Sequence, residues 1–173
     1  MLRRARAAQI TYWVRLSWKR KTDACRLAKW GRSIGSMSEL RLTGLKRGSG
    51  SLSWDQIAAM PATEMTSIAD AAVGEAVPAA LLIELAEPEQ DAAYCSVVSV
   101  DGAYSASVPI GDLVEGGWLA FRLDGAPLPV ENGGPLRLTV ALGRTLCWNV
   151  KDVGELRFTA TKEPDSVPAR PEH

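Results

Sequence analysis

Apolar and polar positions alternate along several stretches from Leu40 onward, which predicts a domain with more strand than helix. Residues 94–100 are rich in β-forming side chains, and the alternation continues on a return strand over residues 104–108. Asp101-Gly102, between these two segments, is a two-residue hairpin signal. Further strands are predicted at residues 118–123, 136–142 and 156–161.

Two short helices are predicted from their end signals. Ser53-Trp-Asp-Gln56 has the spacing of a capping box, so a helix should start there and run toward Met60, before Pro61 ends it. A second helix should occupy residues 78–88, with a proline in its first turn and another proline closing it. This mixture of elements predicts an α+β class, a strand-rich mixed α/β fold in a single domain.

The size of the chain suits one core. Its 173 residues are 46% hydrophobic, and no apolar run approaches the roughly 20 residues that cross a bilayer. The N-terminus also lacks the apolar region of a secretory signal, so a cytoplasmic protein is expected. We expect the domain at residues 39–162, a basic N-terminal extension at 1–38 and a disordered proline-rich tail at 163–173.

Charge is divided unevenly along the chain. Residues 1–36 carry ten Lys and Arg against one acid, a net charge of +9, so the remainder carries −9. Because Trp13, Trp18 and Trp30 lie among these cations, one interpretation is an arm that binds nucleic acid or a membrane surface. The favoured interpretation is an extension without dedicated function, created when Met1 and not Met37 is taken as the start.

Several kinds of catalytic chemistry are excluded by what the sequence lacks. The single histidine, His173, is the last residue, so no Ser-His-Asp triad or Cys-His pair can form in an ordered core. Neither a P-loop nor a GxGxxG motif is present. The cysteines, Cys25, Cys95 and Cys147, show no CxxC spacing, which predicts reduced thiols and neither a disulfide framework nor a zinc site.

A candidate anion site remains in Asn132-Gly-Gly-Pro-Leu-Arg137 and the following Asn149-Val-Lys151. The glycines allow close approach of the backbone to a ligand, and Arg137 offers a bidentate fork for a phosphate. Lys151 would add a second positive charge. On the residues alone, an ordinary turn with an exposed arginine and a surface lysine is the favoured alternative.

A resemblance reverses that preference. Residues 40–161 resemble the molybdopterin-binding domain of the sulfite oxidase family, which includes small bacterial members that reduce methionine sulfoxide. The landmarks, in chain order, are PAALLIELAEP at 78–88, YCSVVSVDG at 94–102, LAFRLDGAPLP at 119–129, GGPLRL at 133–138 and Val150-Lys151.

The resemblance implies a molybdopterin cofactor and assigns residues to it. Asn132, Arg137 and Lys151 correspond to the positions that hold the pterin phosphate and the molybdenum-side pocket. Asn149 and Val150 would present backbone beside the lysine. Ser99 falls where the family has a small polar residue near the cofactor, although an ordinary strand residue is an equal alternative.

The cysteine thiolate that the family uses as a molybdenum ligand has no counterpart here. No cysteine lies between Cys25 and Cys95, and Asp70 would be a poor replacement because its carboxylate is a hard ligand. The sequence therefore favours a catalytically degenerate pseudoenzyme that binds a pterin, a small anion or a protein partner. The alternative is an active molybdenum oxidoreductase, transferring oxygen atoms, with a metal ligand other than cysteine.

Overall fold

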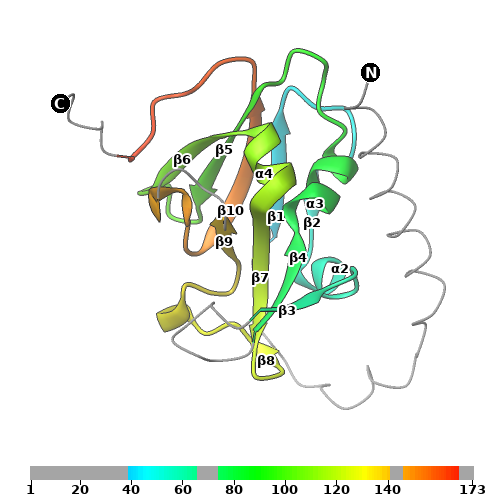
Figure 1. The fold of residues 1–173 in the computed structure, drawn as a ribbon, viewed down its shortest axis with the longest axis vertical. Coiled ribbons are helices and arrows are strands. Elements are labelled where there is room, and N and C mark those ends of the chain that lie inside the picture. The colour runs from blue at the N-terminus through cyan, green and yellow to red at the C-terminus, as the bar shows by residue number, and fades with distance from the viewer. Residues whose placement is uncertain (1–38, 66–73, 141–145, 168–173) are drawn as a thin grey trace. The chain divides into compact units, whose positions relative to one another are not determined.

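In a computed structural model of the chain, residues 39–65, 74–140 and 146–167 are described (Figure 1). The chain divides into two units, residues 1–36 and 37–173, and every described residue belongs to the second. No helix among the described residues is long and apolar enough to cross a membrane.

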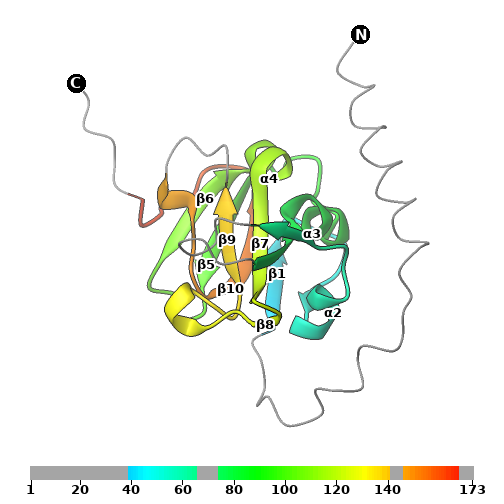
Figure 2. The ribbon, with the colours of Figure 1, turned by 60° about the horizontal axis from the view of Figure 1, so that its bottom comes forward.

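Two sheets form the described domain. The first has the order β2 (Ser51–Leu52), β1 (Leu40–Gly44), β10 (Val153–Thr159), β5 (Tyr94–Ser99) and β6 (Ser105–Pro109). The second has the order β3 (Thr63–Met65), β4 (Gly74–Pro78), β7 (Gly117–Leu123) and β8 (Ala126–Pro127), and β9 (Arg137–Val140) also pairs with β7 (Figure 2). The helices are α2 (Trp54–Ala58), α3 (Ala79–Ala86) and α4 (Ile110–Gly116), with 3-10 turns η2 (Val130–Asn132) and η3 (Leu146–Trp148).

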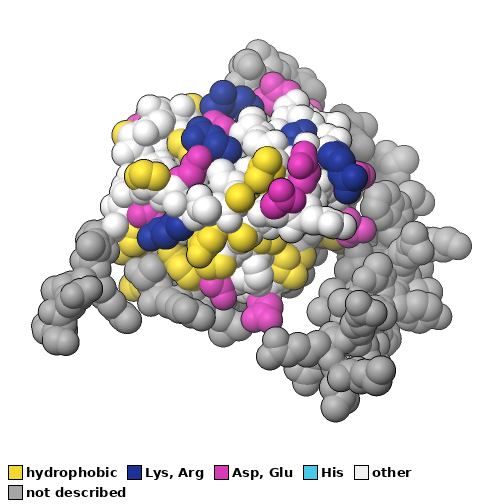
Figure 3. Space-filling model, turned by 90° about the horizontal axis from the view of Figure 1, so that it is seen from above, with side chains coloured by type: hydrophobic (Ala, Val, Ile, Leu, Met, Phe, Trp, Pro, Cys, Tyr) yellow, Lys and Arg dark blue, Asp and Glu magenta, His cyan; other side chains and the backbone are white. Residues whose placement is uncertain are grey.

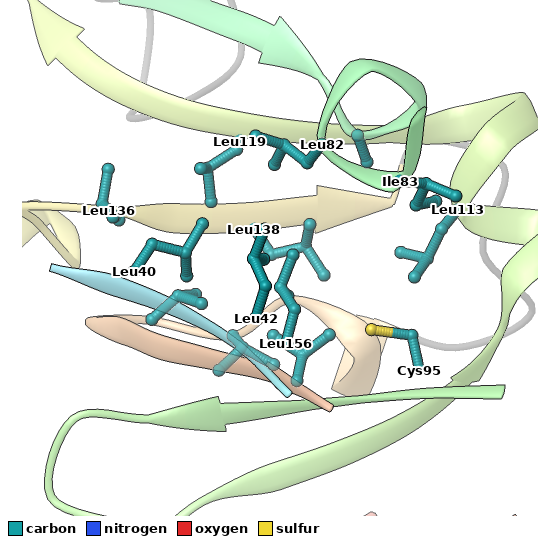
Figure 4. Close-up of a cluster of buried hydrophobic side chains, with 14 of the residues drawn as sticks. Leu40, Leu42, Leu82, Ile83, Cys95, Leu113, Leu119, Leu136, Leu138 and Leu156 are labelled. Atoms are coloured by element: carbon teal, nitrogen blue, oxygen red, sulfur yellow. The ribbon is translucent and has the colours of Figure 1, made fainter. Parts of the chain in front are cut away.

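The main core lies between the two sheets. Leucines of the first sheet, such as Leu42 and Leu156, point toward Leu119 and Leu138 of the second, and α3 and α4 add side chains at one end (Figure 4). A smaller apolar cluster of Ala76, Ala120 and Leu128 lies apart from this core. Residues 118 and 120 of β7 thus face away from the main core, as expected from the period of two along a strand.

The predicted helices form with the expected end signals. In α2, Ser53 Oγ accepts a hydrogen bond from Gln56 N at 3.2 Å, and Gln56 Oε1 accepts one from Ser53 N at 2.8 Å, which completes the capping box. Pro78 is the N-cap of α3, and Glu87 ends that helix in a left-handed conformation with φ 46°. Together with the strands, they confirm the strand-rich α+β prediction.

The strand predictions overlap β5, β6, β7, β9 and β10, although residues 141 and 142 of one predicted strand lie outside the described residues. Helix α4 was missed. Its sequence, Ile-Gly-Asp-Leu-Val-Glu-Gly, is short and contains two poor helix formers, so its helical signal is weak. Packing of the buried Leu113 in the core, beside α3 and β7, accounts for a helix there.

Candidate anion-binding site

The glycine turn between η2 and β9 is held by its own backbone. Gly133 N donates to Val130 O and Gly134 N donates to Pro129 O, both at 2.9 Å. Gly133 has φ 87°, in the left-handed region that favours glycine, and the peptide bond between Gly134 and Pro135 is cis. These two backbone bonds hold the turn that leads into β9, whose first residue is Arg137.

Neither glycine leaves room for a larger side chain. A Cβ at Gly134 would collide with the carbonyl oxygen of Leu128. A Cβ at Gly133 would lie 2.7 Å from Lys151 Cγ and 3.1 Å from Arg137 Cδ. The stems of the two basic side chains thus pack over Gly133, and we refer to Asn132, Gly133, Arg137 and Lys151 as the anion cradle.

Arg137 is oriented from within the cradle. Its Nη1 donates to the carbonyl oxygen of Asn132 at 3.0 Å, so the contribution of Asn132 seen here is a backbone one. Arg137 lies on β9 opposite Ala120 of β7, a pairing of a long side chain with a small one. A guanidinium held in this way needs less ordering when it meets a phosphate.

Lys151 is brought to the cradle by a second turn. Asp152 N donates to Gly133 O at 2.8 Å, and Asp152 has φ 48°. Lys151 is exposed and forms no ion pair among the described residues. Desolvation, followed by the charge of Asp101, raises the pKa of Asp152 above its ordinary value.

Asn149 and Val150, which precede Lys151, are hydrogen-bonded to β9. Asn149 Oδ1 accepts a hydrogen bond from Val140 N at 2.9 Å, at the end of β9. Val150 is buried and exchanges two backbone bonds with Leu138, at 2.9 and 3.1 Å. Because both backbone groups of Val150 are used, its amide and carbonyl already have partners in the fold.

Ser99 lies in the other sheet and serves the β5–β6 hairpin. Its Oγ donates to Asp101 Oδ1 at 2.6 Å and accepts from Tyr104 N at 3.1 Å. Among the described contacts, none joins Ser99 to the cradle. The structure therefore brings Asn132, Arg137 and Lys151 together and places Ser99 in a separate hydrogen-bond network.

The two described cysteines lie in the core and on η3. Cys95 is fully buried in the core (Figure 4), and desolvation raises the pKa of its thiol well above the ordinary value. Cys147 is half-buried on η3, where its carbonyl oxygen accepts a hydrogen bond from the hydroxyl of Tyr104 at 2.6 Å. Cys25 and Asp70 lie outside the described residues. Within the described ranges, no group of three or more His, Cys, Asp or Glu could hold a metal ion.

Sequence reasoning missed a charged cluster on the outer face of the first sheet. The buried carboxylate of Glu155 accepts from Arg41 Nη2 at 2.9 Å, Thr43 Oγ1 at 2.6 Å and Arg157 Nε at 3.1 Å. Desolvation opposes ionisation, but the hydrogen bonds from Arg157 and Thr43 and the two positive charges outweigh it and lower the pKa of Glu155. We call these four residues the Glu155 cluster. Arg41 and Glu155 are 114 residues apart, and no local motif connects them.

Comparison with known proteins establishes the family. The family model described as the oxidoreductase molybdopterin binding domain matches residues 71–167, more than half of the chain. The chain therefore belongs to this family of molybdopterin-binding oxidoreductase domains, which confirms the resemblance seen in the sequence.

A solved structure shows the same fold. The sulfane dehydrogenase SoxCD from Paracoccus pantotrophus is 19% identical, with a TM-score of 0.63 over 76% of this chain. The match covers 40% of the SoxCD chain, so the matched part of this protein corresponds to less than half of that relative. A search of curated proteins finds no match.

The residues present fit one end of the family's cofactor and not the other. The cradle, with two cations packed over a glycine, is suited to a phosphate. The metal end requires a soft thiolate, but Cys95 is fully buried in the core, where desolvation opposes formation of the thiolate. The sequence between Cys25 and Cys95 contains no further cysteine.

Proposed function

We propose that this domain holds a pterin through its phosphate and is catalytically degenerate as an oxygen-atom transferase. The observation that supports this proposal is the combination of an intact anion cradle with the missing cysteine between residues 25 and 95. In the family, the cofactor supplies oxygen-atom transfer at molybdenum. The proposal gives this chain the binding part of that function, toward the pterin and, through it, toward a protein partner.

The cradle would recognise a phosphate through short-range contacts with its own side chains. Residues 37–173 carry the acidic excess of the chain. On the upper face of the domain, which Figure 3 shows and which lies away from the end that carries η2, acidic and basic side chains lie among one another. A phosphate would therefore not be attracted by a broad positive surface. It would be bound at short range, by the guanidinium fork of Arg137 and the ammonium of Lys151.

The backbone prepares the cradle for this role. Arg137 is held against Asn132 O, and the Asp152 amide ties the lysine turn to Gly133. Because these bonds lie within the chain itself, they restrict the conformations of the two turns, and less conformational freedom is lost on binding. Arg137 and Lys151 hold and orient the phosphate in this proposal, and no described residue takes part in a proton or oxygen transfer.

The test is the pterin and metal content of protein purified natively from a molybdenum-replete host. Released-pterin fluorescence and elemental mass spectrometry should find pterin without stoichiometric molybdenum. Arg137→Ala and Lys151→Ala should each lower pterin retention by about tenfold or more, since each removes a charge-assisted contact. Arg47→Ala is the matched control, because Arg47 is exposed on the loop after β1.

Two results would contradict the proposal in different ways. About one molybdenum and one pterin per chain would show a working metal site with a ligand other than cysteine, and degeneracy would be wrong. Protein that retains no pterin, or retains it equally in the Arg137→Ala and Arg47→Ala variants, would show that the cradle does not bind the cofactor.

A further inference from the structure

Strand β6 lies at the edge of the first sheet and has little intrinsic protection there. It pairs with β5 on one side, with Ala106 opposite Val97, while the amides of Ser105 and Ser107 point away from that strand. Edge strands are usually guarded against pairing with another chain by charged side chains, prolines or a cover. The sequence of β6, Ser-Ala-Ser-Val-Pro, has no charge, and its proline is at the end.

Residues 163–167, which we call the strap, cover this edge. Ser105 N donates to Ser166 Oγ and Ser107 N donates to Asp165 Oδ2, both at 3.1 Å. Ser166 N donates to Ser105 O at 2.9 Å, and Glu163 N donates to Ser107 Oγ at 3.2 Å. The first part of the segment expected to be a disordered tail is thus bound along β6.

The strap satisfies the edge mainly with side chains. Among the residues that the structure describes, only the bond from Ser166 N to Ser105 O joins the strap to β6 backbone to backbone, whereas an added strand would pair both amides with carbonyl groups. Its two ion pairs, Arg157 with Glu163 and Lys162 with Asp165, are long, each at 3.5 Å. Long pairs with exposed cations contribute little to stability. A short segment held in this way opens more readily than a strand within a sheet.

We propose that the edge of β6 is a self-association surface whose partner is β6 of a second copy of this chain, and that the strap competes with that partner. Antiparallel pairing centred on Ala106 would place serine opposite serine on the two strands, with no charged residue facing another. The first sheet of one copy would then continue into the first sheet of the other copy. The uncharged, self-complementary sequence favours this partner over a charged peptide.

The experiment removes the strap bonds in the full chain. In Asp165→Ala/Ser166→Pro, the two side-chain acceptors and the Ser166 amide are lost together. Light scattering after size exclusion should show self-association to twice the parental mass, at least about tenfold tighter than in the parent. Hydrogen exchange should show faster exchange of the Ser105 and Ser107 amides in dilute protein.

A blocking substitution identifies the surface. Ser107→Pro, added to the double variant, removes an outward amide without breaking the β5 ladder, and it should restore the parental mass. The single variant Asp165→Ala, which loses one bond, provides a milder case if the double variant folds poorly. Three results would each overturn the proposal. They are an unchanged mass of the Asp165→Ala/Ser166→Pro and Asp165→Ala variants, unchanged hydrogen exchange of the Ser105 and Ser107 amides, and self-association that persists after Ser107→Pro is added.

Discussion

The Glu155 cluster and the anion cradle both gather two basic side chains, but they use them differently. In the cluster, Arg41 and Arg157 both form ion pairs with the buried carboxylate of Glu155. In the cradle, Arg137 meets a backbone carbonyl, and Lys151 has no ion pair among the described residues. The comparison shows that gathered cations alone do not mark a binding site. What distinguishes the cradle is the lysine charge that the described fold does not balance.

The largest effect is expected from Gly134→Ala, which disrupts the glycine turn that leads from the cradle residue Gly133 into β9. The added Cβ would meet the backbone of Leu128, which cannot move aside as a flexible side chain can. We expect a loss of about 3 kcal/mol or more in the free energy of unfolding, measured by denaturant titration. Gly111→Ala in α4 is the control, since a Cβ there meets nothing within 4 Å. Equal stability of the two variants would show that the glycine turn is not rigid.

The corresponding substitution in the cluster is Glu155→Ala, which leaves two arginines without their carboxylate. Because both guanidinium groups are partly exposed, the expected loss is about 2 kcal/mol in unfolding free energy. Pterin retention should not change, since the cluster and the cradle share no described contact. A variant that folds normally but loses its pterin would show that the two regions are coupled.

The cluster should also give the protein an acid-sensitive stability. The folded-state pKa of Glu155 is lowered, so its contribution is complete above the ordinary value of 4.5 and is lost as the pH falls through the folded-state pKa. Unfolding free energies of the parent and Glu155→Gln should therefore differ most near neutral pH and converge in acid. A constant difference across that range would mean that ionisation of Glu155 does not stabilise the fold.

Gly133→Ala should affect the cradle with a smaller structural cost. The strain of an alanine at φ 87°, and a Cβ that displaces the Lys151 stem, should cost about 1–2 kcal/mol and weaken pterin retention. Gly125→Ala separates the two effects, because Gly125 has φ 78° but open space around its Cα. If both variants retain pterin equally, the position of Lys151 over Gly133 is unimportant for binding.

The smallest effect is expected from Ser99→Ala. Loss of the hydroxyl bonds to Asp101 and Tyr104 should cost about 1 kcal/mol or less in stability, and pterin retention should be unchanged. Thermal unfolding and released-pterin fluorescence measure the two quantities. A loss of pterin at unchanged stability would return Ser99 to the cofactor site.

Local signals account for what could be predicted from the sequence. Capping at Ser53, the proline at position 78 and the alternation in β5 and β6 all depend on neighbouring residues, so they could be recognised without the fold. The glycine-rich turn and the arginine were noticed because they lie within six positions of one another, from Asn132 to Arg137. The residues alone favoured an ordinary turn, and the family resemblance assigned them, with Lys151, to the pterin phosphate.

Features that depend on distant residues could not be predicted. The Glu155 cluster joins β1 to β10, and Glu155-Leu-Arg157 alone indicates only the polar side of a strand. The binding of Asp165 and Ser166 to β6 was hidden by the composition of a proline-rich tail. Ser99 was assigned by resemblance, and its hydrogen bonds within the hairpin were not evident from sequence.

The position of β10 has a consequence for how the protein is made. This strand is the centre of the first sheet, pairing parallel with β1 and antiparallel with β5, yet it is the last strand of the described chain (Figure 1). During synthesis, β1 and β5 leave the ribosome before the strand that must lie between them exists. β1 and β5 therefore cannot be joined into one sheet until β10 is available, and the first sheet is completed only after residue 159 has emerged.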